Sequence, residues 1–583
     1  MADTNQFRTH SCGELRLSHV NTKVTLAGFV DGSKMEGKAI DLRDRTGATG
    51  CLMPEKPGRT LDDLWLQVTP ESVVQITGKV MKRKKEDPSL ATGDVLVMIE
   101  SITILSPSEV LPRELERHNM GEEDRFRYRI LYLRRLGMQS RLELRSRFLL
   151  EARKHLAGKN FVEVETPLLG RPDAEAAASF LIPVADGKGY ALPASAQAFK
   201  QAAIAGGVEK LFQIARCFRN ETTTTPVRQP EFSVLDLELA WADEEQVLAE
   251  TEELLAAVLE TVGAKVKLPL ERIPYDKALQ RFGTATPDLR ARFEIADATG
   301  TAKSQGVKEA AEALGKDGAA RFIRVEGGVE RLGDAELDLL VANVNRRGKA
   351  KAAWIKSGEK TGLRGPGVRY FGTGVNDAMT AFKAKGGDAV LLTLAGEEAD
   401  AHQAAGEVRT ELVRMIGDKD SRAFACAFIT RLPFFAFDEK SKEWVPKRHP
   451  FTQPRDEDLG ILDDEKRKTA ALSKAFTLVI NGVEIGSGSV RNHDAQLQEK
   501  IFKLLGVPAG EIQKRYGAAQ ENFRYGIPPH AGITLQLDRL LAMAAGEDAI
   551  DEVMAFPKAR VGGDLMHETP MPLDSQHVRS LLG

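Results

Sequence analysis

The chain has 583 residues, a length typical of about three to five domains. Its composition, 42% hydrophobic and 28% charged, is that of a folded globular protein and excludes a collagen-like, low-complexity or wholly disordered chain. The net charge of −3 excludes a strongly basic nucleic-acid-binding protein, so any nucleic acid must be bound by local patches.

The cysteines and the lengths of the apolar runs indicate the cellular compartment of the protein. The four cysteines are far apart and form no CxxC pair, which argues against a disulfide framework or a zinc finger. No apolar run approaches the roughly 18–20 residues that span a bilayer, and residues 1–15 lack the apolar stretch of a signal peptide. We therefore expect a cytoplasmic protein with no membrane partner.

Residues 1–106 are predicted to form a small β-domain. Prolines and charged residues between 107 and 140 then indicate a hinge or linker. Several short strands at this spacing are typical of a sandwich or barrel, and a five-stranded OB-fold barrel fits the length. The predicted strands are the apolar-rich segments 24–30, 39–44, 73–80 and 95–99.

The rest of the chain is predicted to be an α+β catalytic domain in two parts, 141–286 and 419–583. Residues 287–418, between these parts, are richer in Ala, Gly and Lys, and we interpret them as an inserted α+β domain. Apolar periodicity predicts helices at 142–156, 245–263, 306–315 and 334–346, a strand at 161–167 and a buried strand at 475–480.

The first candidate for chemistry is the segment 212–221, which ends in Arg219 and Glu221. Its apolar residues predict a strand, and the chain returns through 228–238 as a second strand. An Arg and a Glu at the mouth of such a hairpin can clamp a nucleotide, because guanidinium groups fork onto phosphate or carboxylate. A surface hairpin with ion pairs explains the pattern equally well.

Two further segments each allow a functional and a structural interpretation. Small residues around Ser195, Gln197 and Lys200 are suited to a pocket for a polar ligand, or to an ordinary helix start. The glycines between Glu484 and Arg491 permit a ligand to approach the backbone, or belong to a strand pair with a bulge.

The last segment, 532–540, places Arg539 where a strand becomes a helix. This Arg is available to a nucleotide, or forms a buried pair with Asp538. The sequence contains no glycine-rich phosphate-binding loop of the P-loop or dinucleotide type. A nucleotide would therefore be held on a sheet by arginines.

In their order and spacing, these segments resemble the class II aminoacyl-tRNA synthetases, most closely the bacterial aspartyl-tRNA synthetases. The resemblance covers almost the whole chain and is highly specific. The matching segments are 142–167 for motif 1, 218–232 for motif 2, 537–539 for motif 3, 448–452 and 481–491 for the aspartate branch, and 287–418 for the inserted domain called GAD.

The resemblance implies a two-step reaction. The α-carboxylate of L-aspartate attacks the α-phosphate of ATP, and the aspartyl group then passes to the 3′-terminal ribose of tRNA. It also implies Mg²⁺ with ATP, a twofold homodimer built through motif 1, and aspartate tRNA as the partner, with asparagine tRNA left open. The alternative is a diverged paralogue that binds aspartate, adenylate or RNA without efficient charging.

The resemblance assigns roles at the nucleotide. Arg219 would bridge the substrate carboxylate and the α-phosphate, and Glu221 would meet the adenine side of ATP. Phe232 would stack on the adenine, while Arg539 would pack on its other face and reach the γ-phosphate. Glu484 would hold Mg²⁺. The three catalytic residues implied are Arg219, Glu221 and Arg539.

The resemblance assigns roles at the amino acid and at the tRNA as well. Lys200 and Arg491 would pair with the β-carboxylate of aspartate, and a neutral amide would leave these charges unpaired. The other aspartate-binding residues implied are Glu175, Ser195, Gln197, Asp236 and His449. In the barrel, Phe29 would stack on a base and the basic run Lys82, Arg83 and Lys84 would meet phosphates, unless that run is only a solvated loop.

Several positions depart from the family pattern. Thr477 stands where an Asp usually helps to hold Mg²⁺, Arg448 replaces the first His of a pair, and Gln536 replaces a glycine near ATP. The motif 2 loop, 222–228, has few charges. Thr477, Gln536 and the motif 2 loop favour the paralogue. An active ligase is favoured by the retained set Lys200, Arg219, Glu221, Glu484, Arg491 and Arg539, and it is the function we expect.

Overall fold

The structure is a computed structural model that describes residues 6–36, 38–109, 120–172, 179–184, 188–220, 224–291, 293–358, 362–416, 424–438, 442–464, 466–559, 562–572 and 574. Two predicted site residues, Glu175 and Glu221, lie outside the described residues. The chain divides into two compact units, Met1–Ser146 with Glu221–Pro230 and Ala549–Asp574, and Arg147–Asn220 with Glu231–Asp548 and Ser575–Gly583.

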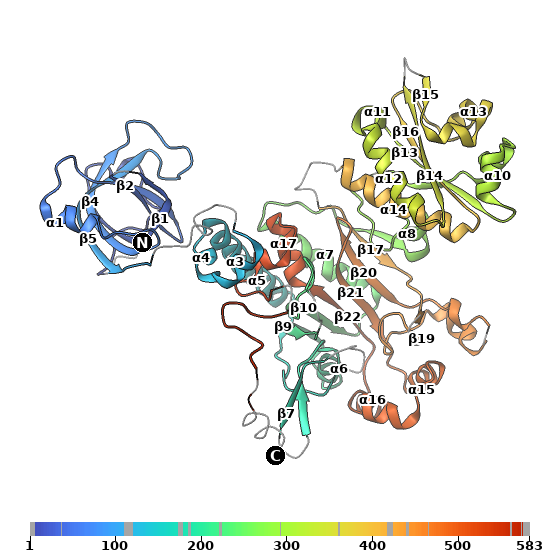
Figure 1. Cartoon of the computed structure of the whole chain (residues 1–583). Helices are drawn as coiled ribbons and strands as arrows, with labels where there is room; N and C mark the ends of the chain where they lie inside the picture. Colours follow the sequence, from blue (N-terminus) through green and yellow to red (C-terminus); the bar gives the residue numbers. More distant parts are fainter. Residues whose placement is uncertain are drawn as a thin grey trace. The chain divides into compact units, whose positions relative to one another are not determined.

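The first unit contains a closed five-stranded barrel in the order β1-β2-β3-β5-β4, drawn in blue in Figure 1. Alternate residues of β4, such as Val74, Ile76 and Val80, point into the barrel core, as expected for strands with one buried face. The predicted OB-type barrel is therefore confirmed. Its elements are β1 (Lys23–Glu36), β2 (Ala39–Asp44), β3 (Gly47–Leu52), α1 (Arg59–Trp65), β4 (Val73–Lys82) and β5 (Val95–Ser106).

Helices follow the barrel where the sequence indicated a linker, α3 (Glu122–Arg127) and α4 (Arg129–Leu133), and α5 (Leu136–Gly158) contains the predicted helix 142–156. The three acidic residues that begin α3 suit a helix N-terminus. Tyr132 and Met138 form a small core, and the buried Arg129 donates to the backbone oxygens of Met554 (2.6 Å) and Ala555 (2.8 Å). These contacts are far apart in sequence, which is why charge content alone suggested a linker.

The second unit contains an eight-stranded sheet in the order β11-β17-β20-β21-β22-β10-β9-β6, antiparallel except at its two edges. Strand β6 is only Val162–Glu163, shorter than predicted, and both residues are exposed. The other strands are β9 (Lys210–Phe218), β10 (Glu231–Ala240), β11 (Glu271–Pro274), β17 (Cys426–Thr430), β20 (Ala475–Ile480), β21 (Val483–Arg491) and β22 (His530–Gln536).

Helices and two hairpins accompany this sheet (Figure 1). The predicted helix 245–263 is α7, and the predicted change from strand to helix before Arg539 is confirmed as β22 and α17. The helices are α6 (Gln197–Ala205), α7 (Glu244–Glu260), α8 (Tyr275–Phe282), α15 (Ala495–Leu504), α16 (Ala509–Arg524) and α17 (Leu537–Ala545), and the hairpins pair β7 (Leu181–Val184) with β8 (Lys188–Ala191) and β18 (Phe435–Asp438) with β19 (Glu443–Pro446).

The inserted segment forms a five-stranded sheet in the order β12-β13-β16-β14-β15. Every residue of β16 is buried, with Leu391 packed in one apolar cluster and Leu392 in another. Helices cover both faces, so this is the expected α+β insertion. Its elements are β12 (Ile295–Asp297), α9 (Thr299–Ser304), α10 (Lys308–Leu314), β13 (Ala319–Val325), α11 (Gly328–Arg331), α12 (Asp334–Arg346), β14 (Lys351–Gly358), β15 (Gly362–Arg364), α13 (Val375–Ala381), β16 (Ala389–Ala395) and α14 (Glu398–Ile416).

Within the described part of the chain, no helix is both long and apolar enough to cross a bilayer.

Candidate active site

A polar pocket of about 230 Å³ is formed by the central strands of the eight-stranded sheet together with the segments that precede α6 and β20. Strands β9, β10, β21 and β22 all contribute to its walls. The pocket brings together seven of the predicted site residues, Ser195, Gln197, Arg219, Phe232, Asp236, His449 and Arg491, with two positions that depart from the family pattern, Arg448 and Gln536.

Two carboxylates on β10 form the buried end of the site. Because side chains alternate along a strand, Asp236 and Glu238 point to the same face of the sheet. Lys200 of α6 lies between them, with its Nζ 2.7 Å from Asp236 Oδ1 and 3.6 Å from Glu238 Oε2. All three residues are at most 1% exposed, so this charge cluster is fully removed from water.

Arg491, at the end of β21, connects this cluster to the pocket. Its Nε donates to Glu238 Oε1 (2.9 Å), and its two Nη groups donate to His449 Nε2 (2.6 Å) and Gln197 Oε1 (3.2 Å). A further bond reaches the Ser489 hydroxyl. The structure thus brings together Gln197, Lys200, Asp236, His449 and Arg491, which the sequence analysis had placed around the substrate aspartate.

The charges of this cluster fix its protonation. Burial alone would raise the pKa of Glu238, but Arg491 and Lys200 overcome that effect and hold it at about 2, below the ordinary 4.5. Burial, reinforced by Arg491, lowers the pKa of His449 well below 6.5. His449 is therefore neutral, and because its Nε2 accepts from Arg491, its Nδ1 carries the proton.

Three side-chain donors at the pocket are buried without a hydrogen-bond acceptor among the described residues: Gln197 Nε2, His449 Nδ1 and Arg448 Nε. Buried donors are nearly always satisfied in folded proteins, so these atoms indicate where a ligand supplies acceptors. All three are donors, and two lie on residues that contact Arg491. The arrangement suits a ligand that carries carboxylate or phosphate oxygens.

The other end of the pocket contains arginines and one aromatic ring. Arg219 follows β9, and its guanidinium carbon lies 5.3 Å from the ring centroid of the buried Phe232. Arg539, on α17, and Glu484 do not line the pocket, and Arg539 donates to the backbone oxygen of Glu484 (3.1 Å). The Glu484 carboxylate is bound by Arg448, at 3.1 Å. The predicted role of Glu484 as a Mg²⁺ ligand stays a prediction.

The glycines of β21 have a structural reason in addition to any role toward a ligand. A Cβ on Gly488 would overlap the backbone oxygen of Gly532 and the ring of Phe476. The segment 481–491 contains β21, which pairs with β20 across a bulge at Leu478 and Val479, as in the structural interpretation that the sequence left open. Asp538 likewise accepts from the backbone nitrogen of Ser233 (2.6 Å).

Glu238, which binds both Arg491 and Lys200, was not among the predicted site residues. The signal was present in the alternation 235–238, where the position two residues after Asp236 must share its face. Thr534 was not predicted either; its hydroxyl contacts Asp236 and lies 3.3 Å from Lys200 Nζ. No local pattern distinguishes this threonine from others, because its role comes from the pairing of β10 with β22.

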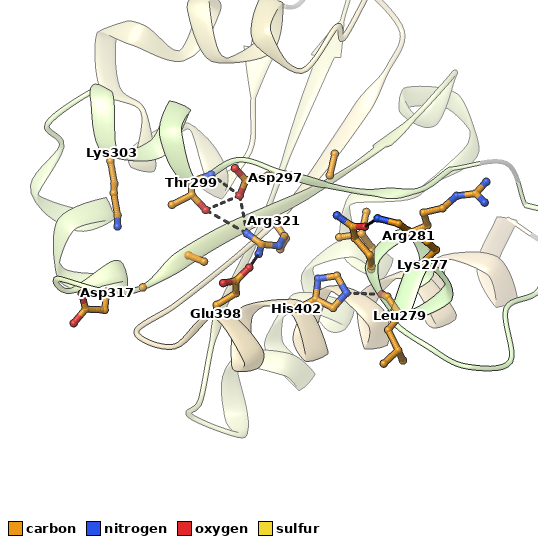
Figure 2. Close-up of a pocket in the computed structure, with 15 residues that line it drawn as sticks. Lys277, Leu279, Arg281, Asp297, Thr299, Lys303, Asp317, Arg321, Glu398 and His402 are labelled. Atoms are coloured by element: carbon orange, nitrogen blue, oxygen red, sulfur yellow. Dashed lines mark hydrogen bonds and ion pairs between the residues drawn. The ribbon is translucent and has the colours of Figure 1, made fainter. Parts of the chain in front are cut away.

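A larger pocket of about 950 Å³, shown in Figure 2, lies between α8 and the inserted sheet. Some of its polar side chains are already partnered: Arg321 pairs with Asp297 (2.7 Å), and His402 contacts the backbone oxygen of Leu279. Among the described residues that line it, none has a buried side-chain donor without an acceptor. The smaller pocket is therefore the better candidate for chemistry.

The predicted tRNA residues lie in the barrel of the first unit. One face of the Phe29 ring is covered by Arg134, whose guanidinium carbon is 4.1 Å from the ring centroid. Lys82 and Lys84 are exposed, whereas Arg83 lies 3.7 Å from Asp87. Two of the three basic side chains are thus accessible to a polyanion.

Comparison with known proteins agrees with this geometry. Residues 121–560 match the model of the tRNA synthetases class II (D, K and N). The chain is 36% identical to an aspartate–tRNA(Asp/Asn) ligase of Thermoanaerobacter pseudethanolicus, over 98% of both chains. It is 35% identical to an aspartate–tRNA ligase of Bacteroides thetaiotaomicron, over 99% of this chain and 98% of that one.

Solved structures share the fold. Asparaginyl-tRNA synthetase from Pyrococcus horikoshii, complexed with asparaginyl-adenylate, has a TM-score of 0.57 at 19% identity and covers 94% of this chain and 98% of its own. A putative aspartyl-tRNA synthetase from Leishmania major has a TM-score of 0.57 at 18% identity and covers 96% and 95%. The chain belongs to the class II tRNA synthetases and, within them, to the family of the aspartate–tRNA ligases.

Proposed function

We propose that this protein attaches L-aspartate to tRNA through an aspartyl-adenylate made from ATP. The observation that carries the proposal is the buried cluster of Lys200, Arg491 and Glu238 beneath a pocket with unpartnered donors on Gln197 and His449. Fixed cations in a dry site favour a carboxylate side chain, and a neutral amide would leave buried donors and charges unpaired.

Each end of the pocket supports one part of the reaction. Lys200, Arg491 and the neutral His449 would orient the β-carboxylate of aspartate, while Asp236 would receive the α-ammonium. Arg219 and Phe232 would hold the α-phosphate and the adenine of ATP. Binding both substrates in one pocket lets positioning and fixed positive charge lower the barrier, without a protein nucleophile. Glu175, Ser195, Glu221 and Arg539 complete the proposed set.

The proposed macromolecular partner is tRNA, bound through Phe29, Lys82, Arg83 and Lys84 of the barrel. Binding should weaken as salt rises, because phosphate contacts release counterions. Relatives are named for aspartate tRNA alone or for both aspartate and asparagine tRNA. Both tRNAs therefore belong in the charging assay.

A homodimer is part of the proposal. Leu150, Val162, Leu168 and Leu169 lie close in sequence in the motif 1 region and are 47–55% exposed. Solvent-exposed apolar side chains of this kind are typical of a surface that is buried in a homodimer interface. Mg²⁺ would accompany ATP, and the four free thiols are compatible with a cytoplasmic location.

Aspartate-dependent exchange between ATP and pyrophosphate tests the first step, and aminoacylation of the two tRNAs tests the second. We expect exchange with aspartate and none with asparagine. If the folded protein shows no exchange at saturating aspartate and Mg²⁺, the proposal is wrong.

The second candidate function is binding of aspartate, adenylate or RNA without efficient charging. The observation that favours it is Gln536, a bulky side chain that lines the pocket where the resemblance implies a glycine near ATP. Aspartate binding in calorimetry without exchange would support this candidate.

A further inference from the structure

Arg448 brings a second cation to the nucleotide end of the pocket. Its Nη1 lies 3.1 Å from Glu484 Oε1 and its Nη2 lies 3.4 Å from Oε2, so the guanidinium addresses both oxygens of one carboxylate. Nη2 also donates to the hydroxyl of Thr477. This fork is the geometry in which arginine binds oxyanions most strongly.

The groups that hold Arg448 are fixed by the sheet. Thr477 and Glu484 lie on the neighbouring antiparallel strands β20 and β21, and Thr477 is only 3% exposed. The backbone oxygen of Glu484 accepts from Arg539 (3.1 Å). Arg448 is therefore oriented by two side chains whose backbones are part of the sheet, and its position does not depend on a ligand.

The residues at Glu484 do not fit a metal ion held by the protein. A Mg²⁺ ion prefers several carboxylate or carbonyl oxygens, whereas one carboxylate and one hydroxyl meet here. Both carboxylate oxygens face a guanidinium, so a divalent cation at Glu484 would lie beside a like charge. Throughout the described part of the chain, no group of three His, Cys, Asp or Glu residues is placed to hold a metal ion.

Arg448 also has a buried donor without an acceptor. Its Nε is shielded from solvent and makes no hydrogen bond within the described residues, although Arg448 lines the pocket. An anion in the pocket would satisfy this donor. Because Glu484 balances the positive charge of Arg448, the pair has little net charge. Arg448 would therefore bind an anion mainly through a hydrogen bond from its Nε–H.

We propose that Arg448 is a phosphate-binding residue that takes, at Glu484, the place of a protein-held divalent cation. Glu484 then acts by orienting Arg448 and not by ligating metal. The ligand class is the polyphosphate of a nucleotide. This identification rests on the proposed function, whereas the contacts of Arg448 with Glu484 and Thr477 rest on the geometry alone.

The first experiment uses Mn²⁺ alone as the probe, read by electron paramagnetic resonance on the full chain without nucleotide. Wild type and Glu484→Gln should bind the same amount of Mn²⁺. The double variant Thr477→Asp/Arg448→His removes the guanidinium and adds a carboxylate and an imidazole, and it should gain a bound ion. A Mn²⁺ ion in wild type that Glu484→Gln removes would overturn the inference.

The second experiment measures ATP binding by calorimetry in the presence of EDTA. We expect wild type to bind and Arg448→Met to bind at least ~10-fold more weakly, the scale of one lost charge-assisted hydrogen bond. Arg448→Lys should fall between them. The matched control is Arg455→Met, because Arg455 forms a similar pair with Glu244 (2.8 Å and 3.1 Å) and does not line the pocket.

Equal ATP affinity of wild type and Arg448→Met would overturn the inference. The aspartate-dependent exchange assay keeps this result separate from the proposed function. If exchange occurs but the affinity for ATP does not depend on Arg448, only the inference fails. If exchange is absent while ATP binding still depends on Arg448, only the proposed function fails.

Discussion

Replacing Arg491 by leucine should remove aspartate-dependent chemistry and destabilise the protein for two different reasons. Arg491 is 2% exposed and binds Glu238, His449, Gln197 and Ser489. The variant removes the cation that would meet the β-carboxylate. It also leaves the Glu238 carboxylate, which is 0% exposed, without its closest partner.

The loss of stability in Arg491→Leu can be estimated from these contacts. Breaking a buried ion pair by removing one partner costs about 3–5 kcal/mol, because a charge stays buried without compensation. Lys200 remains 3.6 Å from Glu238 and offsets part of this cost. We therefore expect Arg491→Leu to lower the free energy of unfolding by ~3 kcal/mol, the lower end of this range, as measured by urea titration.

A second substitution separates the effect of Arg491→Leu on activity from its effect on stability. In Arg491→Leu/Glu238→Gln the buried charge is gone, so stability should return most of the way to wild type. Aspartate-dependent exchange should stay reduced, since losing a desolvated charge pair with the substrate costs about 2–5 kcal/mol, or roughly 30-fold to several thousand-fold in kcat/KM.

Arg455→Leu is the matched control for the Arg491 variants. Arg455 forms a partly buried pair with Glu244 at 2.8 Å and does not line the pocket. Its loss should lower stability and leave the KM for aspartate unchanged. Recovery of exchange in the double variant, or near-normal exchange in Arg491→Leu, would refute the placement of the substrate carboxylate at Arg491.

Three other predictions concern protonation, tRNA and packing. Because the pKa of Glu238 is about 2 in the folded state and 4.5 ordinarily, wild type should lose about 3 kcal/mol of stability as pH falls from 4.5 towards 2, and acid unfolding of Arg491→Leu/Glu238→Gln should lack that loss. Phe29→Ala should weaken tRNA charging by about 1–3 kcal/mol of stacking and leave pyrophosphate exchange unchanged; equal losses in both assays would contradict a role in tRNA binding alone. Gly488→Ala should cost about 1–3 kcal/mol in thermal or urea unfolding, since its Cβ would overlap Gly532, and an unaffected protein would show that β21 and β22 separate easily.

The fold could be predicted well where a pattern is local. Alternation in 73–80 specified a strand with one buried face, and the apolar run 475–480 specified a central strand. The helices α3 and α4 were missed, because they are short and because Arg129, which begins α4, is held by bonds to a segment more than 400 residues away. No window of sequence contains that interaction.

At the candidate active site, too, local patterns could be predicted from the sequence and long-range contacts could not. Residue types at motif positions led to Lys200, Asp236 and Arg491, and the strand period would have added Glu238. What the sequence could not supply is which charges meet. Arg491 and Glu238 are 253 positions apart and become partners only because β21 and β10 both pair with β22.

Arg448 and Thr477 illustrate why that pairing matters for function. Taken separately, each is a departure from the family pattern and suggests lost chemistry. In the structure they contact one another, and Arg448 also binds Glu484, so a residue without a carboxylate at 477 adjoins a cation at 448. A carboxylate at 477 beside Arg448 would add a second anion, and a neutral residue at 448 would leave Glu484 without its cation. The two changes are therefore electrostatically coupled, and coupled changes that keep a site charge-balanced favour altered cation use over decay of the site.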